Sequence, residues 1–132
     1  MGVNRKKTFT VKHQVLTILD ANNYATELGL FVLGFTRTTP VCDTISYRLY
    51  MNRFSYVNVY MSWREKLQEN HTGIVVEVEY NNIWYKPQGR DGSDSISAVR
   101  LKLMRHLSEC GVVGVLPYLR AQKIDELLKG QE

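Results

Sequence analysis

The sequence predicts a small α+β domain: an antiparallel sheet of four or five strands, with one N-terminal helix and two C-terminal helices on one of its faces. Three observations lead to this fold class. The length of 132 residues fits a single domain. The middle of the chain alternates in the way strands do, and both ends repeat apolar residues at helical spacing. With 44% hydrophobic and 23% charged residues, the composition excludes disordered and collagen-like proteins.

The N-terminal third is predicted to contain a helix and a buried strand. A basic segment over residues 1–9 precedes them, and we expect it to be flexible. The helix is expected to begin at the capping residue Thr10, because the apolar residues that follow recur every three or four positions. These residues are Val11, Val15, Ile18 and Leu19. The helix ends near Ala21 or continues to Glu27, and the apolar run 28–36 then predicts a strand buried on both faces.

The middle of the chain is predicted to form two hairpins. Residues 44–63 alternate and are rich in β-branched and aromatic side chains, with the turn expected at Asn52 and Arg53. Residues 74–80 alternate as well, and Asn81-Asn82 is a hairpin signal that predicts a returning strand over 83–86. Between the hairpins, a capping-box pattern over 62–65 predicts a short helix over 63–69.

The C-terminal third is predicted to contain a polar loop and two helices. Residues 87–94 contain two glycines and form the loop, which we expect to be flexible. Ser93 or Asp94 is expected to cap the first helix, which Gly111 ends. Its apolar stripe consists of Ile96, Val99, Leu103, Leu107 and Cys110. The second helix is expected to run from Leu116 to Gly130. The residues predicted to point inward from it are Leu119, Ile124, Leu127 and Leu128.

Strand periodicity divides the hairpin residues between two faces of the sheet. The apolar face is expected to form the core and consists of Ile45, Tyr47, Leu49, Met51, Val57, Val59, Met61, Ile74, Val76 and Val78. The opposite face consists of Ser46, Arg48, Tyr50, Phe54, Tyr56, Asn58, Tyr60, Glu77 and Glu79. Three predicted helices are enough to cover one face of a small sheet but not both, so we expect this second face to be exposed.

The aromatic and polar face predicts a binding function, and single-stranded nucleic acid is the first candidate ligand. Aromatic rings on a sheet surface can stack on unpaired bases, while neighbouring arginines contact phosphates. The residues expected to bind nucleic acid or another partner are Arg48, Tyr50, Arg53, Phe54, Tyr56, Asn58 and Tyr60. Residues 1–64 carry eight Lys and Arg against three Asp and Glu. This net positive charge favours a negatively charged ligand such as nucleic acid. Secondary basic contacts are expected from Arg5, Lys6, Lys7, Arg90, Arg100 and Arg105.

Two other interpretations of this face remain open. Tyrosine and arginine are enriched at protein interfaces, so the face also fits a protein-interaction module such as an inhibitor, adaptor or assembly subunit. A homo-oligomer would bury the same face between its own copies. A small accessory protein of a phage or mobile element would also fit these properties. Alternatively, the tyrosines simply suit an amphipathic strand, and Arg48 pairs across the sheet with Glu77 or Glu79.

Catalysis, a cofactor and a bound metal are not expected. Glu77 and Glu79 lie on one side of one strand, but no third acidic residue accompanies them at a recognisable spacing. His106 and Cys110 are four residues apart on one helix face, which is half of a zinc site. The residues that could complete it are Cys42, His13 and His71. Because Cys110 also continues the apolar stripe of its helix, we interpret the pair as structural.

The sequence predicts a cytoplasmic protein without membrane contact. Two isolated cysteines indicate a reducing, intracellular setting and not a disulfide framework. The longest apolar stretch, residues 28–35, is much shorter than the roughly 20 residues needed to cross a bilayer. The basic N-terminus has no apolar segment behind it, so no export signal is expected.

Overall fold

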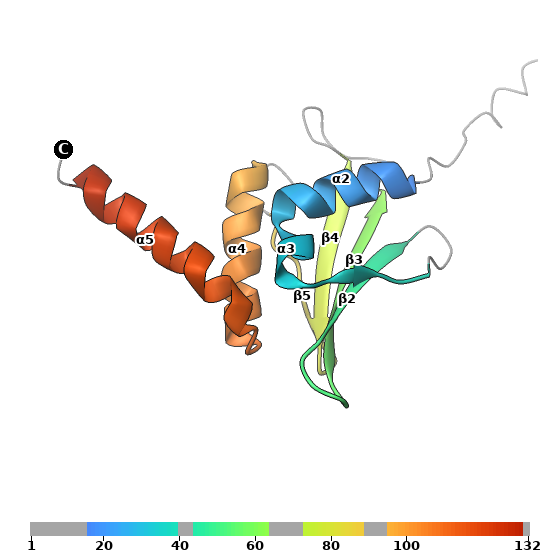
Figure 1. Cartoon of the computed structure of the whole chain (residues 1–132). Helices are drawn as coiled ribbons and strands as arrows, with labels where there is room; N and C mark the ends of the chain where they lie inside the picture. Colours follow the sequence, from blue (N-terminus) through green and yellow to red (C-terminus); the bar gives the residue numbers. More distant parts are fainter. Residues whose placement is uncertain (1–15, 40–43, 64–72, 89–94, 131–132) are drawn as a thin grey trace, which may run out of the picture.

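The computed structural model describes residues 16–39, 44–63, 73–88 and 95–130. One antiparallel sheet has the strand order β1-β2-β3-β4-β5, so each strand pairs with the next one along the chain (Figure 1). The strands are β1 (Thr36–Arg37), β2 (Ile45–Tyr50), β3 (Tyr56–Trp63), β4 (Ile74–Tyr80) and β5 (Ile83–Tyr85). The helices are α2 (Ile18–Leu28), α3 (Leu30–Leu33), α4 (Ile96–Glu109), the 3-10 turn η1 (Val113–Val115) and α5 (Leu116–Gly130). The predicted α+β class is therefore confirmed.

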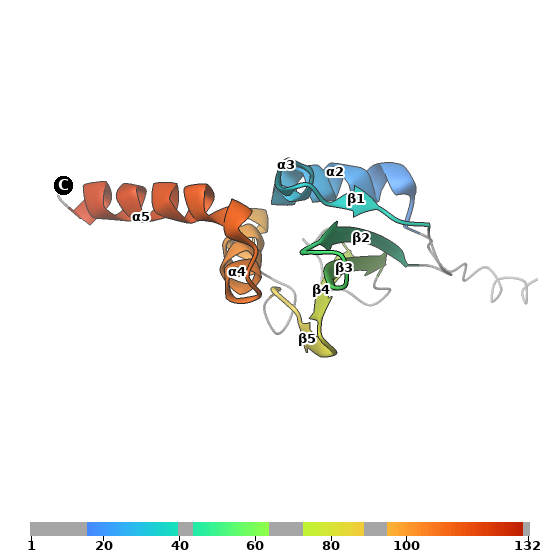
Figure 2. The same cartoon turned by 60° about the horizontal axis from the view of Figure 1, so that its bottom comes forward.

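The core lies between one face of the sheet and the helices α2 and α4. The predicted apolar face faces this core, where Tyr47, Val59, Met61, Val76 and Val78 are completely buried. Leu28 from α2 and Leu103 and Leu107 from α4 complete it, also without exposed surface. Leu49 and Met51 are only partly buried, because they lie near the end of the first hairpin. In Figure 2 the helices lie on the same side of the curved sheet, which leaves the opposite face uncovered in the described structure.

The two hairpins confirm the predicted alternation and both turns. Asn81 and Asn82 have positive φ angles of 56° and 65°, the backbone conformation that this two-residue turn requires. In the first hairpin, the side-chain oxygen of Asn52 accepts hydrogen bonds from the backbone N–H groups of Phe54 and Ser55, at 2.8 and 3.1 Å. Trp63 ends strand β3, so the helix predicted to start there is wrong at its first residue. Residues 64–69 lie outside the described residues.

The strand predicted over 28–36 is wrong. Leu28 ends α2, Leu30–Leu33 form the one-turn helix α3, and Thr36 alone of this run is in a strand, β1. Gly29 ends α2 with φ 85° and Gly34 ends α3 with φ 101°, which are left-handed conformations that favour glycine. The periodicity of a short apolar run cannot distinguish a buried strand from a buried helix. The two glycines, which end helices here, were the signal that could have distinguished them.

Helix α2 begins later than predicted. Its capping residue is Thr17, whose hydroxyl accepts a hydrogen bond from the Asp20 backbone N–H at 3.0 Å. The predicted cap Thr10 and residues 11–15 lie outside the described residues, and at its other end the helix continues through Glu27 to Leu28. Similarly, α4 is capped by Ser95, one residue after the predicted Asp94. Gly111, with φ 102°, follows the end of α4 as expected.

Helix α5 has the predicted bounds, but its packing differs from expectation. It contacts mainly α4 and η1 and extends away from the rest of the molecule (Figures 1 and 2). None of its residues is buried in the described structure, and Ile124, Leu127 and Leu128 are 56–60% exposed. The prediction that these three side chains point inward is therefore wrong. Their spacing indicates one apolar side, but spacing does not say whether the same chain covers that side.

Candidate binding surface on the open sheet face

The sheet face opposite the helices carries the predicted binding residues, and we call it the open face. Its members on the strands are Ser46, Arg48, Tyr50, Tyr56, Asn58, Tyr60, Glu77, Glu79 and Trp84. Pairing places Arg48 opposite Asn58, Asn58 opposite Glu79 and Glu79 opposite Trp84. These four residues therefore form one row across four strands. One pair of aromatic residues lies on each side of the centre of this row.

The centre of the row is a hydrogen-bonded chain of polar side chains. Arg48 Nε donates to Asn58 Oδ1 at 3.0 Å, and Asn58 Nδ2 donates to Glu79 Oε1 at 3.2 Å. The other carboxylate oxygen of Glu79 accepts from the Asn82 backbone N–H at 2.9 Å. Asn58 is only 4% exposed, yet both the oxygen and the nitrogen of its side-chain amide have a hydrogen-bond partner. Arg48 is thus linked to Glu79 through Asn58, and not by the direct cross-strand pair that the sequence suggested.

On one side of this row, Tyr50 and Tyr56 form an aromatic pair with Arg48. Their rings pack edge to face with centroids 5.4 Å apart. The guanidinium carbon of Arg48 lies 3.9 Å from the Tyr56 ring centroid, and Arg48 Nη1 donates to the Tyr50 hydroxyl at 3.4 Å. The hydrogen bond with Tyr50 raises the pKa of Arg48 further. Arg48 is therefore a fixed cation held between rings and the Asn58 amide.

On the other side, Tyr60 stacks on Trp84. The ring centroids are 5.4 Å apart and the planes differ by 29°, although the two residues are on β3 and β5 with β4 between them. Burial, followed by the nearby Glu79 carboxylate, raises the pKa of Tyr60. Trp84 is 57% exposed and was missed by the sequence analysis. The two-residue turn at 81–82 was the available signal, because it places Trp84 opposite Glu79 and therefore on the same face.

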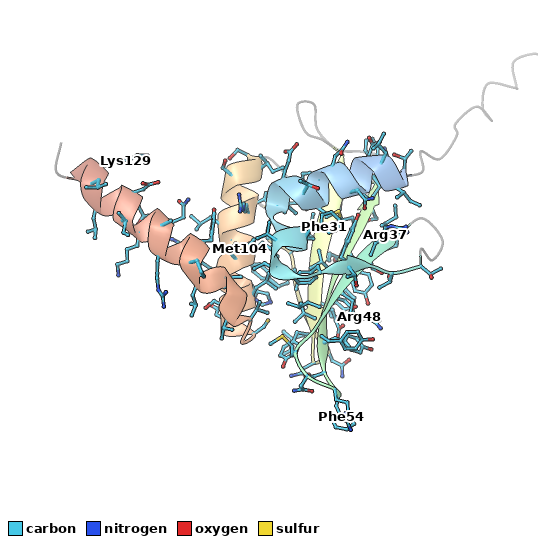
Figure 3. The ribbon with its side chains drawn as sticks, viewed as in Figure 1. Phe31, Arg37, Arg48, Phe54, Met104 and Lys129 are labelled. Carbon is cyan, nitrogen blue, oxygen red and sulfur yellow. The ribbon has the colours of Figure 1, made fainter. Side chains whose placement is uncertain are left out.

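The remaining predicted contacts are more scattered. Phe54 is 86% exposed at the tip of the first hairpin, next to Arg53 in the chain (Figure 3). Arg105 is exposed on α4. Arg100, predicted to flank the solvent side, instead packs under α5, with its guanidinium carbon 4.5 Å from the Tyr118 ring centroid. The predicted contacts Arg5, Lys6, Lys7 and Arg90 lie outside the described residues.

His106 and Cys110 form a second cluster, on the helix side of the sheet. Cys110 Sγ lies 3.6 Å from His106 Nε2, and the His106 ring stacks on Tyr85 with centroids 4.2 Å apart. Burial lowers the pKa of His106 and raises the pKa of the Cys110 thiol, so both groups favour their neutral forms. A cavity of about 280 Å³ borders the pair and is lined by Tyr80, Asn81, Ile83, His106, Glu109 and Cys110.

The side chains of this second cluster pack against one another at the edge of the core, as structural residues do. The ring of His106 is held by Tyr85, and its Nδ1 lies 3.7 Å from an oxygen of the exposed Glu109. Within the described ranges no three His, Cys, Asp or Glu side chains are grouped as metal ligands. The possible further ligands Cys42, His13 and His71 lie outside these ranges. The neutral thiol also lacks the lowered pKa that a cysteine nucleophile requires.

Comparisons with known proteins give no relative from which a role can be transferred. The chain matches no protein-family model, no curated protein and no solved structure. Among the helices that the structure describes, none combines the length and apolar character needed to cross a membrane. The geometry of the open face therefore carries the functional argument.

Proposed function

We propose that this protein binds single-stranded nucleic acid through the open face. The observation that carries the proposal is the arrangement of two aromatic pairs around a fixed arginine, on a sheet face that no described helix covers. Sheet surfaces with stacking rings and cationic neighbours bind unpaired bases with little sequence preference. The isolated cysteines of the sequence favour an intracellular location, where such a ligand would be present.

The two ring pairs supply the stacking surfaces in this proposal. Trp84 is backed by Tyr60 and more than half exposed, so a base stacks on its outer side. Tyr50 is 60% exposed and Tyr56 37%, and they offer a second platform. Each stacked base contributes about 1–3 kcal/mol. Because the rings already pack on one another, little side-chain entropy is lost when a base binds.

Arg48 supplies the phosphate contact. Two of its five donors are engaged by Asn58 and Tyr50, which leaves the outer edge of the guanidinium for a phosphate oxygen. The carboxylates Glu77 and Glu79 repel phosphates, so the backbone of the ligand runs along β2 and β3 and not along β4. Arg53 at the hairpin tip extends this path.

A protein partner is the second candidate, and the two carboxylates favour it. Glu77 and Glu79 are on the strand between Tyr60 and Trp84, so the stacked rings have acidic neighbours. A lysine or arginine of a partner would gain a cation–π contact with Trp84 and an ion pair with a carboxylate. Such a partner binds with weak dependence on Arg48.

Fluorescence anisotropy with labelled mixed-sequence DNA and RNA single strands, at two salt concentrations, tests the first proposal. Binding should be tighter at low salt and should weaken about five- to hundredfold in Trp84→Ala and Tyr56→Ala. Ile83→Ala is the matched control, because Ile83 is in the same hairpin and 66% exposed but faces the cavity on the helix side. Failure of the wild-type protein to bind either strand at low salt contradicts nucleic-acid binding and leaves the protein partner.

A further inference from the structure

A cavity separates part of the β4–β5 hairpin from helix α4. In Figure 1 β5 lies between β4 and α4. The cavity of about 280 Å³ is bordered by both elements, with the hairpin residues Tyr80, Asn81 and Ile83 on one side and residues 106, 109 and 110 of α4 on the other. Because close packing does not fill this space, the side chains that do reach from α4 to the hairpin decide how the hairpin lies.

The rings of Tyr85 and His106 make such a contact. They stack with centroids 4.2 Å apart and planes that differ by 18°. His106 is itself held on α4, where its Nε2 lies 3.6 Å from Cys110 Sγ and its Nδ1 lies 3.7 Å from a carboxylate oxygen of Glu109. The imidazole of α4 is therefore a fixed surface against which Tyr85 packs.

Trp84 directly precedes Tyr85 and lies on the other side of the same strand. Neighbouring strand residues point to opposite faces, so Tyr85 packs toward α4 while Trp84 packs on Tyr60 on the open face. Strand β5 has three residues and is at the edge of the described sheet, where it pairs with β4. The two stacks therefore hold one short edge strand from both of its faces.

The remaining contacts of this segment bind it to β4. At the turn, the Asn82 backbone N–H donates to Glu79 Oε2 at 2.9 Å. Beyond β5, the side chain of Gln88 donates to the Ile74 carbonyl at 2.6 Å and accepts from the Val76 N–H at 3.1 Å. These hydrogen bonds fix where β5 lies along β4, whereas the ring stacks above and below it fix its rotation about the strand axis.

We propose that His106 is a positioning residue for Trp84 and acts through Tyr85. The His106 ring supports Tyr85 from the helix side, and this support holds β5 in the orientation in which Trp84 stacks on Tyr60. The consequence for binding rests on the proposed function, because a base would stack on Trp84 most tightly when that ring is already fixed. The orientation of Trp84 itself can be measured without any ligand.

Tryptophan fluorescence tests the positioning in the absence of nucleic acid. The chain has two tryptophans, so Trp84 is the one that remains in a Trp63→Phe background. There, His106→Ala should shift its emission to longer wavelength and increase its quenching by iodide, because the indole loses its stacked neighbour. Tyr85→Leu, which removes the other ring of the support, should give the same changes.

Two further variants separate the ring stack from general packing of α4. His106→Phe keeps an aromatic ring for Tyr85 and should restore the emission and quenching of the parent protein. Cys110→Ala alters the same helix and the same cavity without removing either ring, and should leave both quantities unchanged. Circular dichroism and urea unfolding establish that each protein is folded.

Nucleic-acid affinity in the chain with both tryptophans shows whether His106 acts through Trp84. His106→Ala should weaken single-strand binding about three- to tenfold, and should cost nothing further once Trp84 is already alanine. In a Tyr56→Ala background the same substitution should keep its full effect, because Tyr56 belongs to the other aromatic pair.

Unchanged emission and quenching of Trp84 in a folded His106→Ala protein overturns the proposal. So does a loss of affinity that is equally large with and without Trp84, which is the result for a general effect on stability. A wild-type protein that binds no single strand contradicts the proposed function instead, and the fluorescence of Trp84 still decides whether His106 positions it.

Discussion

The open face and α5 both expose large apolar or aromatic side chains, but the two regions hold them differently. On the open face, Tyr56 packs on Tyr50 and Arg48, and Trp84 packs on Tyr60. On α5, the exposed leucines have no such support from the rest of the described chain. Exposed side chains that are already fixed suit reversible binding of a ligand, because little order must be gained. Exposed side chains on an unsupported helix would lose more rotamer freedom in any contact they make.

The largest effect on stability is expected from Asn58→Ala. This change removes hydrogen bonds with Arg48 and Glu79 and leaves their polar groups partly unpaired, so the free energy of unfolding should fall by about 1–3 kcal/mol. Urea unfolding measures it. Asn23→Ala, at an exposed position of α2, is the control and should change stability by less than about 0.5 kcal/mol. Equal stability of the two variants would mean that the polar row does not fix the open face.

Arg48→Lys should separate binding from stability. Lysine keeps the charge but cannot reproduce the Asn58 and Tyr50 hydrogen bonds together with the planar contact on Tyr56. We expect nucleic-acid affinity to fall about tenfold, while unfolding changes by about 1 kcal/mol or less. Anisotropy and urea unfolding measure the two quantities. Unchanged affinity would favour a protein partner for the open face.

The buried tyrosine of β2 should make the stability of the protein depend on alkaline pH. Tyr47 faces the core and its hydroxyl donates to Asn22 at 2.7 Å. Burial, only partly offset by nearby Arg37, raises the pKa of Tyr47 to about 12. Since the folded pKa exceeds the unfolded value near 10, the stability from neutral Tyr47 is present below pH 10 and is lost as pH rises toward 12.

Tyr47→Phe should therefore unfold with a weaker dependence on alkaline pH than the wild-type protein. Near neutral pH it should cost about 1 kcal/mol for the lost hydrogen bond with Asn22. Urea unfolding at pH 8 and pH 11 measures both effects. Asn23→Ala, which changes an exposed residue without an ionisable group, is the comparison and should keep the wild-type pH dependence. Identical pH dependence in wild type and Tyr47→Phe would show that Tyr47 does not ionise within this range.

The smallest effect on the isolated chain is expected from Leu127→Gln/Leu128→Gln. These side chains are already exposed in one molecule and glutamine is a good helix former, so monomer stability should change by less than about 0.5 kcal/mol. The melting temperature of the variant should therefore stay close to that of the wild-type protein. Scanning calorimetry measures it. A large loss of stability in the dilute variant would mean that α5 packs within its own chain.

The sequence alone was sufficient wherever structure depends on neighbours close along the chain. The two hairpins, the turn at Asn81 and Asn82 and the division of residues between two sheet faces all follow from a period of two and from turn chemistry. The face that carries Arg48, Tyr56 and Tyr60 was predicted for the same reason. Its composition indicates a binding surface, but the identity of the ligand stays a prediction.

Only the tertiary structure decided which surfaces meet. The apolar run at Leu30–Leu33 became a helix because two glycines could take left-handed conformations beside the core. Arg100 turned from a solvent-facing cation into a packing residue once Tyr118 lay beside it. Trp84 stacks on Tyr60 across an intervening strand, and no described segment covers the apolar side of α5. Amino-acid patterns determine what each side of a helix or strand requires, whereas the path of the whole chain determines whether another segment is there to meet that requirement.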